Sequence, residues 1–185
     1  MKRSRTGNKK SSHLSDKPAF LIGKRIYLRP LEMSDLETLY CWFNNPELRK
    51  YMQMPYPVSS SCERDFIESA MKNPEHITLA IVLKQEHRLI GDIFISPVDK
   101  VHRKASMGIA IGDPSSWSMG YGTEAIEMIA GYAFDTLNLH RVELIVYSFN
   151  DRAVRCYKKL GFKEEGRSRE AHFSGGRYHD IIHMG

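Results

Sequence analysis

Cysteine is scarce in this chain: only Cys41, Cys62 and Cys156 occur among its 185 residues. An odd number of cysteines at such wide spacing excludes a disulfide framework and a cysteine-rich zinc site. Long apolar runs are also missing, so no segment approaches the roughly 18 residues needed to cross a membrane. The basic start, residues 1–5, is not followed by the apolar stretch of a signal peptide. These absences favour a reduced, cytoplasmic protein that makes no contact with a membrane.

The chain further lacks an excess of charge of one sign outside its first 17 residues. Residues 1–17 hold six Lys/Arg against one acidic residue, Asp16, whereas residues 18–185 hold 21 basic and 21 acidic residues. The net charge of +5 therefore belongs to the N-terminal tail. We expect this tail to be disordered because it contains almost no apolar side chains. Residues 18–185 are expected to form a single domain without a basic surface for nucleic acid.

The most informative feature that is present is a glycine turn, Gly120-Tyr121-Gly122, which leads directly into a helical pattern. Apolar residues recur there at every fourth position, namely Ala125, Ile129, Ala133 and Leu137, with Ile126 and Phe134 beside them. The first backbone N–H groups of such a helix have no partners and add to the positive end of its dipole. Glycine lets a ligand approach these groups, so the turn predicts a phosphate site, although a helix that simply starts at a glycine turn is the alternative.

The same glycines match the fingerprint of dinucleotide-binding proteins, Gly120-x-Gly122-x-x-Ala125. That fingerprint requires a buried strand that runs directly into the first glycine. Here the nearest strand-like run ends at Ile111, and residues 112–116, which include a proline, intervene. A nicotinamide cofactor is therefore disfavoured.

The remaining pattern predicts the element order β-α-α-β-β-β-α-β-α-β-β. Two capping boxes, Ser34–Glu37 and Ser60–Glu63, are expected to begin the first two helices, and the second helix would bury Phe66, Ile67, Ala70 and Met71. Strands are expected at residues 25–29, 77–83, 89–95, 104–111, 142–146, 162–173 and 178–183. Hairpins around a single β-α-β unit favour an α/β fold with a mixed, mostly antiparallel central sheet flanked by helices.

The segment Tyr51–Pro57 is too rich in proline for a strand and too apolar for an ordinary surface loop. Two interpretations remain open for it. It either covers an acceptor pocket or packs on the core.

Together these features resemble the GNAT acyl-CoA N-acyltransferases. The resemblance is carried by the order of elements, the Gly120–Thr123 turn, Asn150 and the segment Tyr157–Phe162. The segments Tyr27–Leu31 and Tyr178–Ile182 are similar to the branch that holds ribosomal-protein N-terminal acetyltransferases and spermidine acetyltransferases. The chain departs from the family pattern at Trp117, where glutamine or arginine is usual.

The resemblance implies acetyl-CoA as cosubstrate and no metal. Its pyrophosphate would bind the backbone amides of the turn, and the strand before the turn would separate from its neighbour and bind the pantetheine arm. Asn150 would also contact the cofactor, although it can equally serve as a helix N-cap. The cofactor-binding residues expected on this basis are Ile109, Ala110, Ile111, Ser118, Met119, Gly120, Tyr121, Gly122, Thr123 and Asn150.

The chemistry implied is the direct attack of a neutral amine on the thioester. Tyr157 is expected to act as general acid toward the leaving sulfur, with a core aromatic as its alternative role, and Glu32 and Asp92 are candidate bases. We see no covalent nucleophile set. The acceptor would be a primary amine, either a protein N-terminus or a small molecule such as a polyamine, and the enzyme could form a homo-oligomer. A catalytically weak acyl-CoA-binding module used for sensing or assembly is the competing function.

Overall fold

A computed structural model of the protein describes residues 17–52 and 54–185. The predicted disorder of the basic tail falls on residues 1–16, outside the described residues. Lys17, counted above with the tail, donates a hydrogen bond to Asp35 at 3.1 Å. The folded part therefore includes Lys17.

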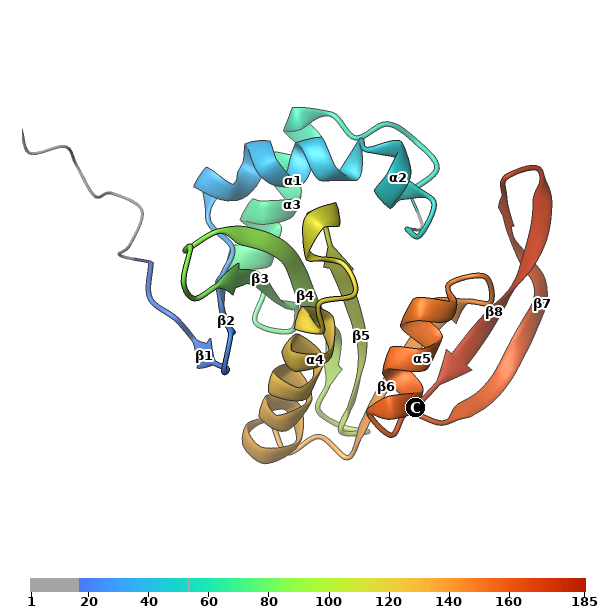
Figure 1. The fold of residues 1–185 in the computed structure, drawn as a ribbon. Helices are drawn as coiled ribbons and strands as arrows, with labels where there is room; N and C mark the ends of the chain where they lie inside the picture. The colour runs from blue at the N-terminus through green and yellow to red at the C-terminus, as the bar shows by residue number, and fades with distance from the viewer. Residues whose placement is uncertain (1–16, 53) are drawn as a thin grey trace, which may run out of the picture.

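An eight-stranded sheet forms the centre of the molecule, in the order β1-β2-β3-β4-β5-β6-β8-β7 (Figure 1). Its paired strands run antiparallel except for β5 and β6, which are parallel. This arrangement confirms the predicted fold class. The strands are β1 (Leu21–Ile22), β2 (Ile26–Pro30), β3 (Ile77–Leu83), β4 (Leu89–Asp99), β5 (Lys104–Ile111), β6 (Arg141–Tyr147), β7 (Glu164–Ser174) and β8 (Arg177–Met184).

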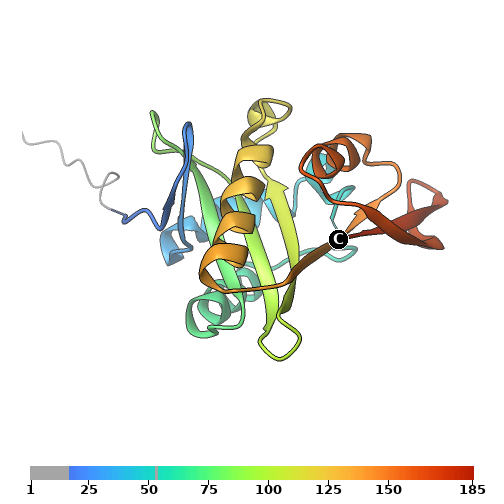
Figure 2. The ribbon, with the colours of Figure 1, turned by 90° about the horizontal axis from the view of Figure 1, so that it is seen from below.

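Helices cover both faces of the sheet (Figures 1 and 2). They are η1 (Met33–Asp35), α1 (Leu36–Phe43), α2 (Pro46–Arg49), α3 (Ser60–Lys72), η2 (Pro114–Ser116), α4 (Tyr121–Gly131), the π-helical turn η3 (Tyr132–Thr136) and α5 (Asp151–Lys159). One core lies under α4 and α5, and a smaller core lies under α1 and α3. No helix in the described ranges is long and apolar enough to span a membrane.

Strand alternation decides which side chains reach each core. In β3, Leu79, Ile81 and Leu83 belong to the α4 core, whereas Ala80 and Val82 belong to the α1–α3 core. In β4, Ile93 and Ile95 likewise face α4. Asp92 is paired with Ala80 in the sheet and so lies on the α1–α3 side.

Both predicted capping boxes are wrong. Ser59 caps α3 by accepting a hydrogen bond from the Cys62 N–H at 3.2 Å. The first helical turn begins one element earlier, at η1, where the Asp35 carboxylate accepts the Glu32 N–H at 2.9 Å. The Ser59 hydroxyl thus takes the role predicted for Ser60, and the Asp35 carboxylate takes the role predicted for Glu37. Glu63 does not cap its helix but is buried inside the protein.

The predicted buried faces are correct only in part. Ile67 is buried, but Phe66 and Met71 of α3 are 42% and 54% exposed. Ala125, Ile129 and Ala133 of α4 are buried, whereas Phe134 is exposed because the π-helical turn changes the helical period there. An apolar pattern does not distinguish a core from an open cleft, and Phe66 lines such a cleft.

Candidate active site

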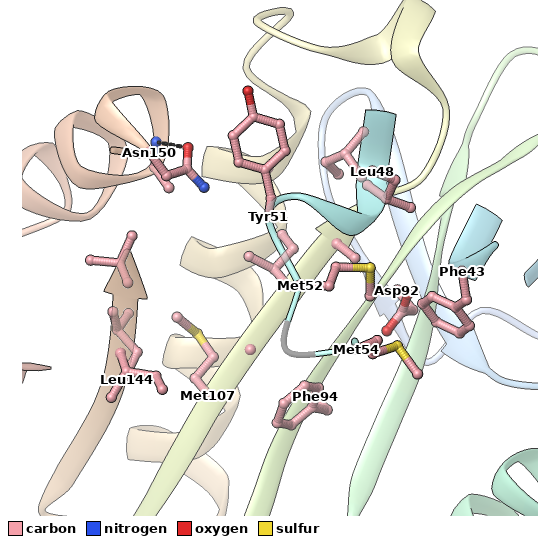
Figure 3. Close-up of a pocket in the computed structure, with 18 of the residues that line it drawn as sticks. Phe43, Leu48, Tyr51, Met52, Met54, Asp92, Phe94, Met107, Leu144 and Asn150 are labelled. Carbon is pink, nitrogen blue, oxygen red and sulfur yellow. Dashed lines mark hydrogen bonds between the residues drawn. The ribbon is translucent and has the colours of Figure 1, made fainter. Parts of the chain in front are cut away.

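A cleft of about 1260 Å³ is lined by the segment Phe43–Val58, α3, β3 and β4 on one side and by β5, the start of α4 and α5 on the other. We call its β5, α4 and α5 side the donor half. The acceptor half is formed by Phe43–Val58, by α3 and by the α3-facing side of β3 and β4, with His76 just before β3. Figure 3 shows Asn150 on the donor side and Phe43, Met54 and Asp92 on the acceptor side.

Strands β5 and β6 diverge along this cleft. They are paired only at Lys104–Ser106, after which β6 pairs with β8 instead. The remainder of β5, Met107–Ile111, stays hydrogen-bonded to β4 on its other edge. Among the described residues no strand pairs with the open edge of Met107–Ile111, so its backbone groups face the cleft.

The glycine turn begins α4 as expected. Gly120 is the N-cap with φ of +82°, a left-handed conformation that glycine adopts without strain, and Ser118 has φ of +61°. A Cβ added to Gly122 would lie 3.8 Å from Ile109 and Ile111 of β5. The first turn of α4 therefore opens directly onto the free edge of β5.

Arg25 holds this turn from β2. Its guanidinium donates to the Met119 carbonyl at 2.8 Å and pairs with Glu124 at 3.0 Å. The same guanidinium lies 4.7 Å from the centre of the Tyr121 ring. Burial alone would raise the pKa of Glu124, but hydrogen bonds from the Arg25 backbone and side chain hold it below its usual value. Arg25 thus fixes the conformation of the anion site without lining it.

Trp117, where the family pattern usually has a polar residue, has a structural role. Its indole N–H donates to the carbonyl of Ile111 at 2.6 Å, which ties the loop to the end of β5. Arg152 of α5 lies 4.5 Å from the indole and 5.7 Å from the ring of Tyr51. These contacts join the two halves at the mouth of the cleft.

Asn150 and Tyr157 both lie on the donor half. Asn150 caps α5 by accepting the Ala153 N–H at 3.3 Å, and its amide nitrogen points away from that helix (Figure 3). Tyr157 is 7% exposed, and burial, with a smaller contribution from Cys156, raises the pKa of its hydroxyl. Cys156 in turn contacts the Thr123 hydroxyl at 3.2 Å, which links α5 to the first turn of α4.

The structure brings most of the predicted site residues together. Those that line the cleft are Ile109, Ala110, Ile111, Ser118, Gly120, Gly122, Thr123, Asn150 and Tyr157. Met119 and Tyr121 do not line it: the first is 54% exposed and the second packs under Arg25. Of the two candidate bases, Asp92 lines the cleft, whereas Glu32 lies at the start of η1 and does not.

The segment Tyr51–Pro57 combines features of its two alternative predicted roles, since it packs on the core and also lines the cleft. Its described residues line the acceptor half, while Met52 and Met54 also pack against the α1–α3 core. Gln53 lies outside the described residues. The acceptor half is thus built largely from methionine, proline and aromatic side chains.

A pair of buried carboxyl groups, Glu63 and Asp92, forms the polar centre of the acceptor half. Their exposed fractions are 2% and 6%, and Glu63 Oε1 and Asp92 Oδ1 accept no hydrogen bond from the described residues. Burial raises the pKa of Glu63 to about 7, and burial together with repulsion from Glu63 raises that of Asp92 to about 7. Our sequence analysis missed Glu63 because it assigned this residue to a capping box. The available signal was its position four residues before Ile67, on the buried helical face.

Across the described ranges, no three His, Cys, Asp or Glu side chains gather as a metal site would require. The arrangement is instead one of a glycine turn at a helix N-terminus, an open strand edge and two buried carboxyl groups.

Comparison with known proteins agrees with this arrangement. A model of the acetyltransferase (GNAT) domain matches residues 25–163. The chain belongs to this family and is an N-acetyltransferase that transfers the acetyl group of acetyl-CoA to an amine.

Several individual N-acetyltransferases are similar to this chain along most of its length. A spermidine N(1)-acetyltransferase of Vibrio cholerae is 30% identical over 164 residues, which is 88% of this chain and 93% of the relative. An uncharacterized N-acetyltransferase, p20 of Bacillus licheniformis, is 27% identical and covers 87% and 92%. The crystal structure of the Vibrio cholerae spermidine N-acetyltransferase with CoA and spermine has a TM-score of 0.79 at 30% identity, covering 86% of this chain and 94% of that one.

Proposed function

We propose that this enzyme acetylates a small-molecule primary amine by direct attack within the cleft. The observation that carries the proposal is the continuity of the cleft. It joins the glycine turn and the open edge of β5 to the buried carboxyl pair, so that donor and acceptor meet in one space. The cleft therefore serves two substrates at once.

The donor half supplies the groups that acetyl-CoA needs. Backbone amides at Ser118–Thr123 bind the pyrophosphate at the start of α4, where the helix dipole is positive. The free edge of Ile109–Ile111 pairs with the amide groups of the pantetheine arm, and an N–H there polarises the thioester carbonyl. Asn150 donates to the same arm from the N-terminus of α5.

Asp92 is the proton acceptor in this proposal. It is paired directly with Ala110 in the sheet, so it lies one strand away from the edge assigned to the thioester. With both pKa values near 7, the Glu63–Asp92 pair holds about one proton at neutral pH and has capacity for one more. A base of this strength is matched to the working pH.

The reaction then proceeds in one addition and one elimination. The amine nitrogen forms a bond to the carbonyl carbon, and its proton passes to the carboxyl pair. The carbon–sulfur bond breaks, and Tyr157 supplies a hydrogen bond and then a proton to the leaving sulfur; its hydroxyl regains a proton from water before the next turnover. The raised pKa of Tyr157 keeps its hydroxyl protonated until that step.

The relatives support a small amine as acceptor, since several are named for spermidine. One of their structures is described as dodecameric, which supports a homo-oligomer here. We also place the enzyme in the reducing cytoplasm, because each of its three cysteines is a free thiol.

The test is CoA thiol release from acetyl-CoA with a panel of primary amines and with peptides that have free N-termini. We expect at least one small amine to raise the rate well above the background hydrolysis of acetyl-CoA, and to exceed every peptide. Faster turnover of peptides would assign the enzyme to protein N-termini. CoA binding without acceleration by any amine or peptide would leave the sensing or assembly module.

A further inference from the structure

The acceptor half is strongly apolar around a single polar centre. Its side chains include Phe43, Leu48, Met52, Met54, Phe66 and Phe94. The Phe94 ring lies across Gly108 of β5, since a Cβ added at Gly108 would approach that ring to 2.3 Å. This wall thus continues to the strand edge assigned to the thioester.

Negative charge in the cleft is confined to one place. Of the described residues that line it, Glu63 and Asp92 are the only carboxylates, and the negative charge of Glu63 helps to raise the pKa of Asp92. The charged residues on the donor half are cations of α5, namely Arg152, Arg155 and Lys159. They provide no counter-ion for a second ammonium group.

The other polar groups of the acceptor half are neutral hydroxyls and an imidazole. They belong to Ser69, Thr78, Ser96, His76, Tyr51 and Tyr56, with the Cys62 thiol beside them, and the Ser96 hydroxyl is hydrogen-bonded to the His76 ring. Such groups can contact a neutral polar substituent. None of them is a carboxylate, so none forms with a second ammonium group the ion pair that Glu63 or Asp92 would form.

From these observations we infer, on the basis of the proposed function, that the acceptor is a monoamine whose remaining part is an apolar alkyl or arylalkyl group. Its one ammonium group lies on the Glu63–Asp92 pair, and its apolar body covers the methionine and phenylalanine side chains. A polyamine would have to place a further ammonium group against that wall.

The exposure of the wall supports an apolar occupant. Phe66 is 42% exposed and Tyr56 is 79% exposed, although both lie in the cleft. Exposed apolar groups in a concave surface are stabilised when an apolar ligand removes them from water. Both carboxyl groups lie in this one place, so the wall offers a single site for an ammonium group.

The experiment compares acceptors that differ only in a second charge. Hexylamine and 1,6-diaminohexane have the same chain length and similar amine pKa values, so the neutral fraction of the reacting nitrogen does not separate them. With the full chain and saturating acetyl-CoA, we expect kcat/KM for hexylamine to exceed that for the diamine by about tenfold or more. We expect 2-phenylethylamine to exceed spermidine in the same way.

A diamine or spermidine used as well as the monoamines would overturn the acceptor class and leave the proposed function intact. No thiol release with any of the four amines, when another primary amine of the panel is acetylated, would likewise overturn only the acceptor class. No release with any amine of the panel would overturn the proposed function itself. The two failures are therefore distinguishable.

A matched pair of variants tests the physical reason. Met54→Glu adds a carboxylate to the wall of the acceptor half, which Asp92 also lines, and Met54→Gln adds a polar side chain of similar size without charge. We expect Met54→Glu to shift the ratio of diamine to monoamine kcat/KM toward the diamine by about tenfold, whereas Met54→Gln leaves that ratio within about twofold of the parent. Equal shifts in the two variants would overturn the charge argument.

Discussion

The two halves of the cleft are built on different principles. The donor half relies on backbone groups: the N-terminal turn of α4 and the unpaired edge of β5. The acceptor half relies on side chains, with apolar residues surrounding Glu63 and Asp92. Backbone recognition depends on conformation and tolerates many side chains, whereas side-chain recognition depends on the identity of each residue. The halves should therefore respond differently to mutation.

The largest effect is expected from Gly122→Glu in the donor half. Its carboxylate would extend from a position 3.8 Å from Ile109 and Ile111, across the free edge of β5, and would repel the pyrophosphate. We expect acetyl-CoA affinity to fall by at least about 10³-fold in calorimetric titration.

Gly122→Ala is the control. Its added methyl makes only ordinary van der Waals contact, so affinity should stay within a few-fold of the parent. Unchanged binding by Gly122→Glu, with a folded protein, would refute the phosphate site.

Tyr157→Phe should give the next largest effect. The ring remains packed on Phe162, 5.8 Å away between centroids, and only the hydroxyl is lost. We expect kcat to fall about 10²-fold, with acetyl-CoA affinity and melting temperature nearly unchanged. A kcat within a few-fold of the parent would make Tyr157 a core aromatic only.

In the acceptor half, Asp92→Asn should lower kcat/KM for the amine by about 10²-fold. For the parent enzyme, kcat/KM measured with an amine of low pKa should fall as the pH drops below about 7, because the pair becomes fully protonated. Glu63→Gln should move this acid limb to lower pH, since it removes the repulsion that raises the pKa of Asp92. If the acid limb of the kcat/KM profile lay at the same pH in the parent and in Glu63→Gln, Glu63 would not affect the pKa of the catalytic base.

Asp92→Asn should also stabilise the fold at high pH. The folded state keeps protons on Glu63 and Asp92 that the unfolded chain releases above about pH 4, so the contribution of these two groups to stability is greatest at low pH and declines as the pH rises to about 7. We expect the variant to melt several degrees above the parent at pH 8, and the difference to disappear near pH 4. A variant that melts lower at pH 8 would contradict the buried-charge argument.

The smallest effect is expected from Arg25→Gln, which releases the turn from β2. Its guanidinium is half exposed, so we expect only about a fivefold rise in KM for acetyl-CoA, with kcat unchanged. Arg167→Gln is the matched control, since Arg167 forms a similar exposed pair with Glu164 and does not line the cleft. Equal effects of the two variants would show that Arg25 has no special role.

The donor half could be predicted largely from sequence because its signals are local. A glycine turn that begins an apolar helical period is visible within about 20 residues, and Asn150 and Tyr157 lie within one short helix. The conformational role of Trp117 was not visible, because its hydrogen-bond partner is a backbone carbonyl. Neither was the support from Arg25, which lies 94 residues before Met119.

The acceptor half was far less predictable. Asp92 was one of two candidate bases, and nothing in the sequence separated it from Glu32. Glu63 matched a capping box as well as a buried position, and Phe66 matched a core position as well as a cleft wall. The local sequence pattern is the same whether Glu63 caps the helix or is buried, and whether Phe66 lies in the core or lines the cleft.

By itself, the sequence predicted the mixed sheet, seven of the eight described strands and the helix that starts at Gly120–Thr123. It missed the short strand β1 and the helix α2. The correct elements follow from periodicity and backbone conformation, which act between residues near in sequence. Only the tertiary structure decided at which residues β5 and β6 part and that Glu63 of α3 and Asp92 of β4 line the same cleft. Both depend on which surfaces pack across the sheet, and burial there raises the pKa of each carboxyl group to about 7.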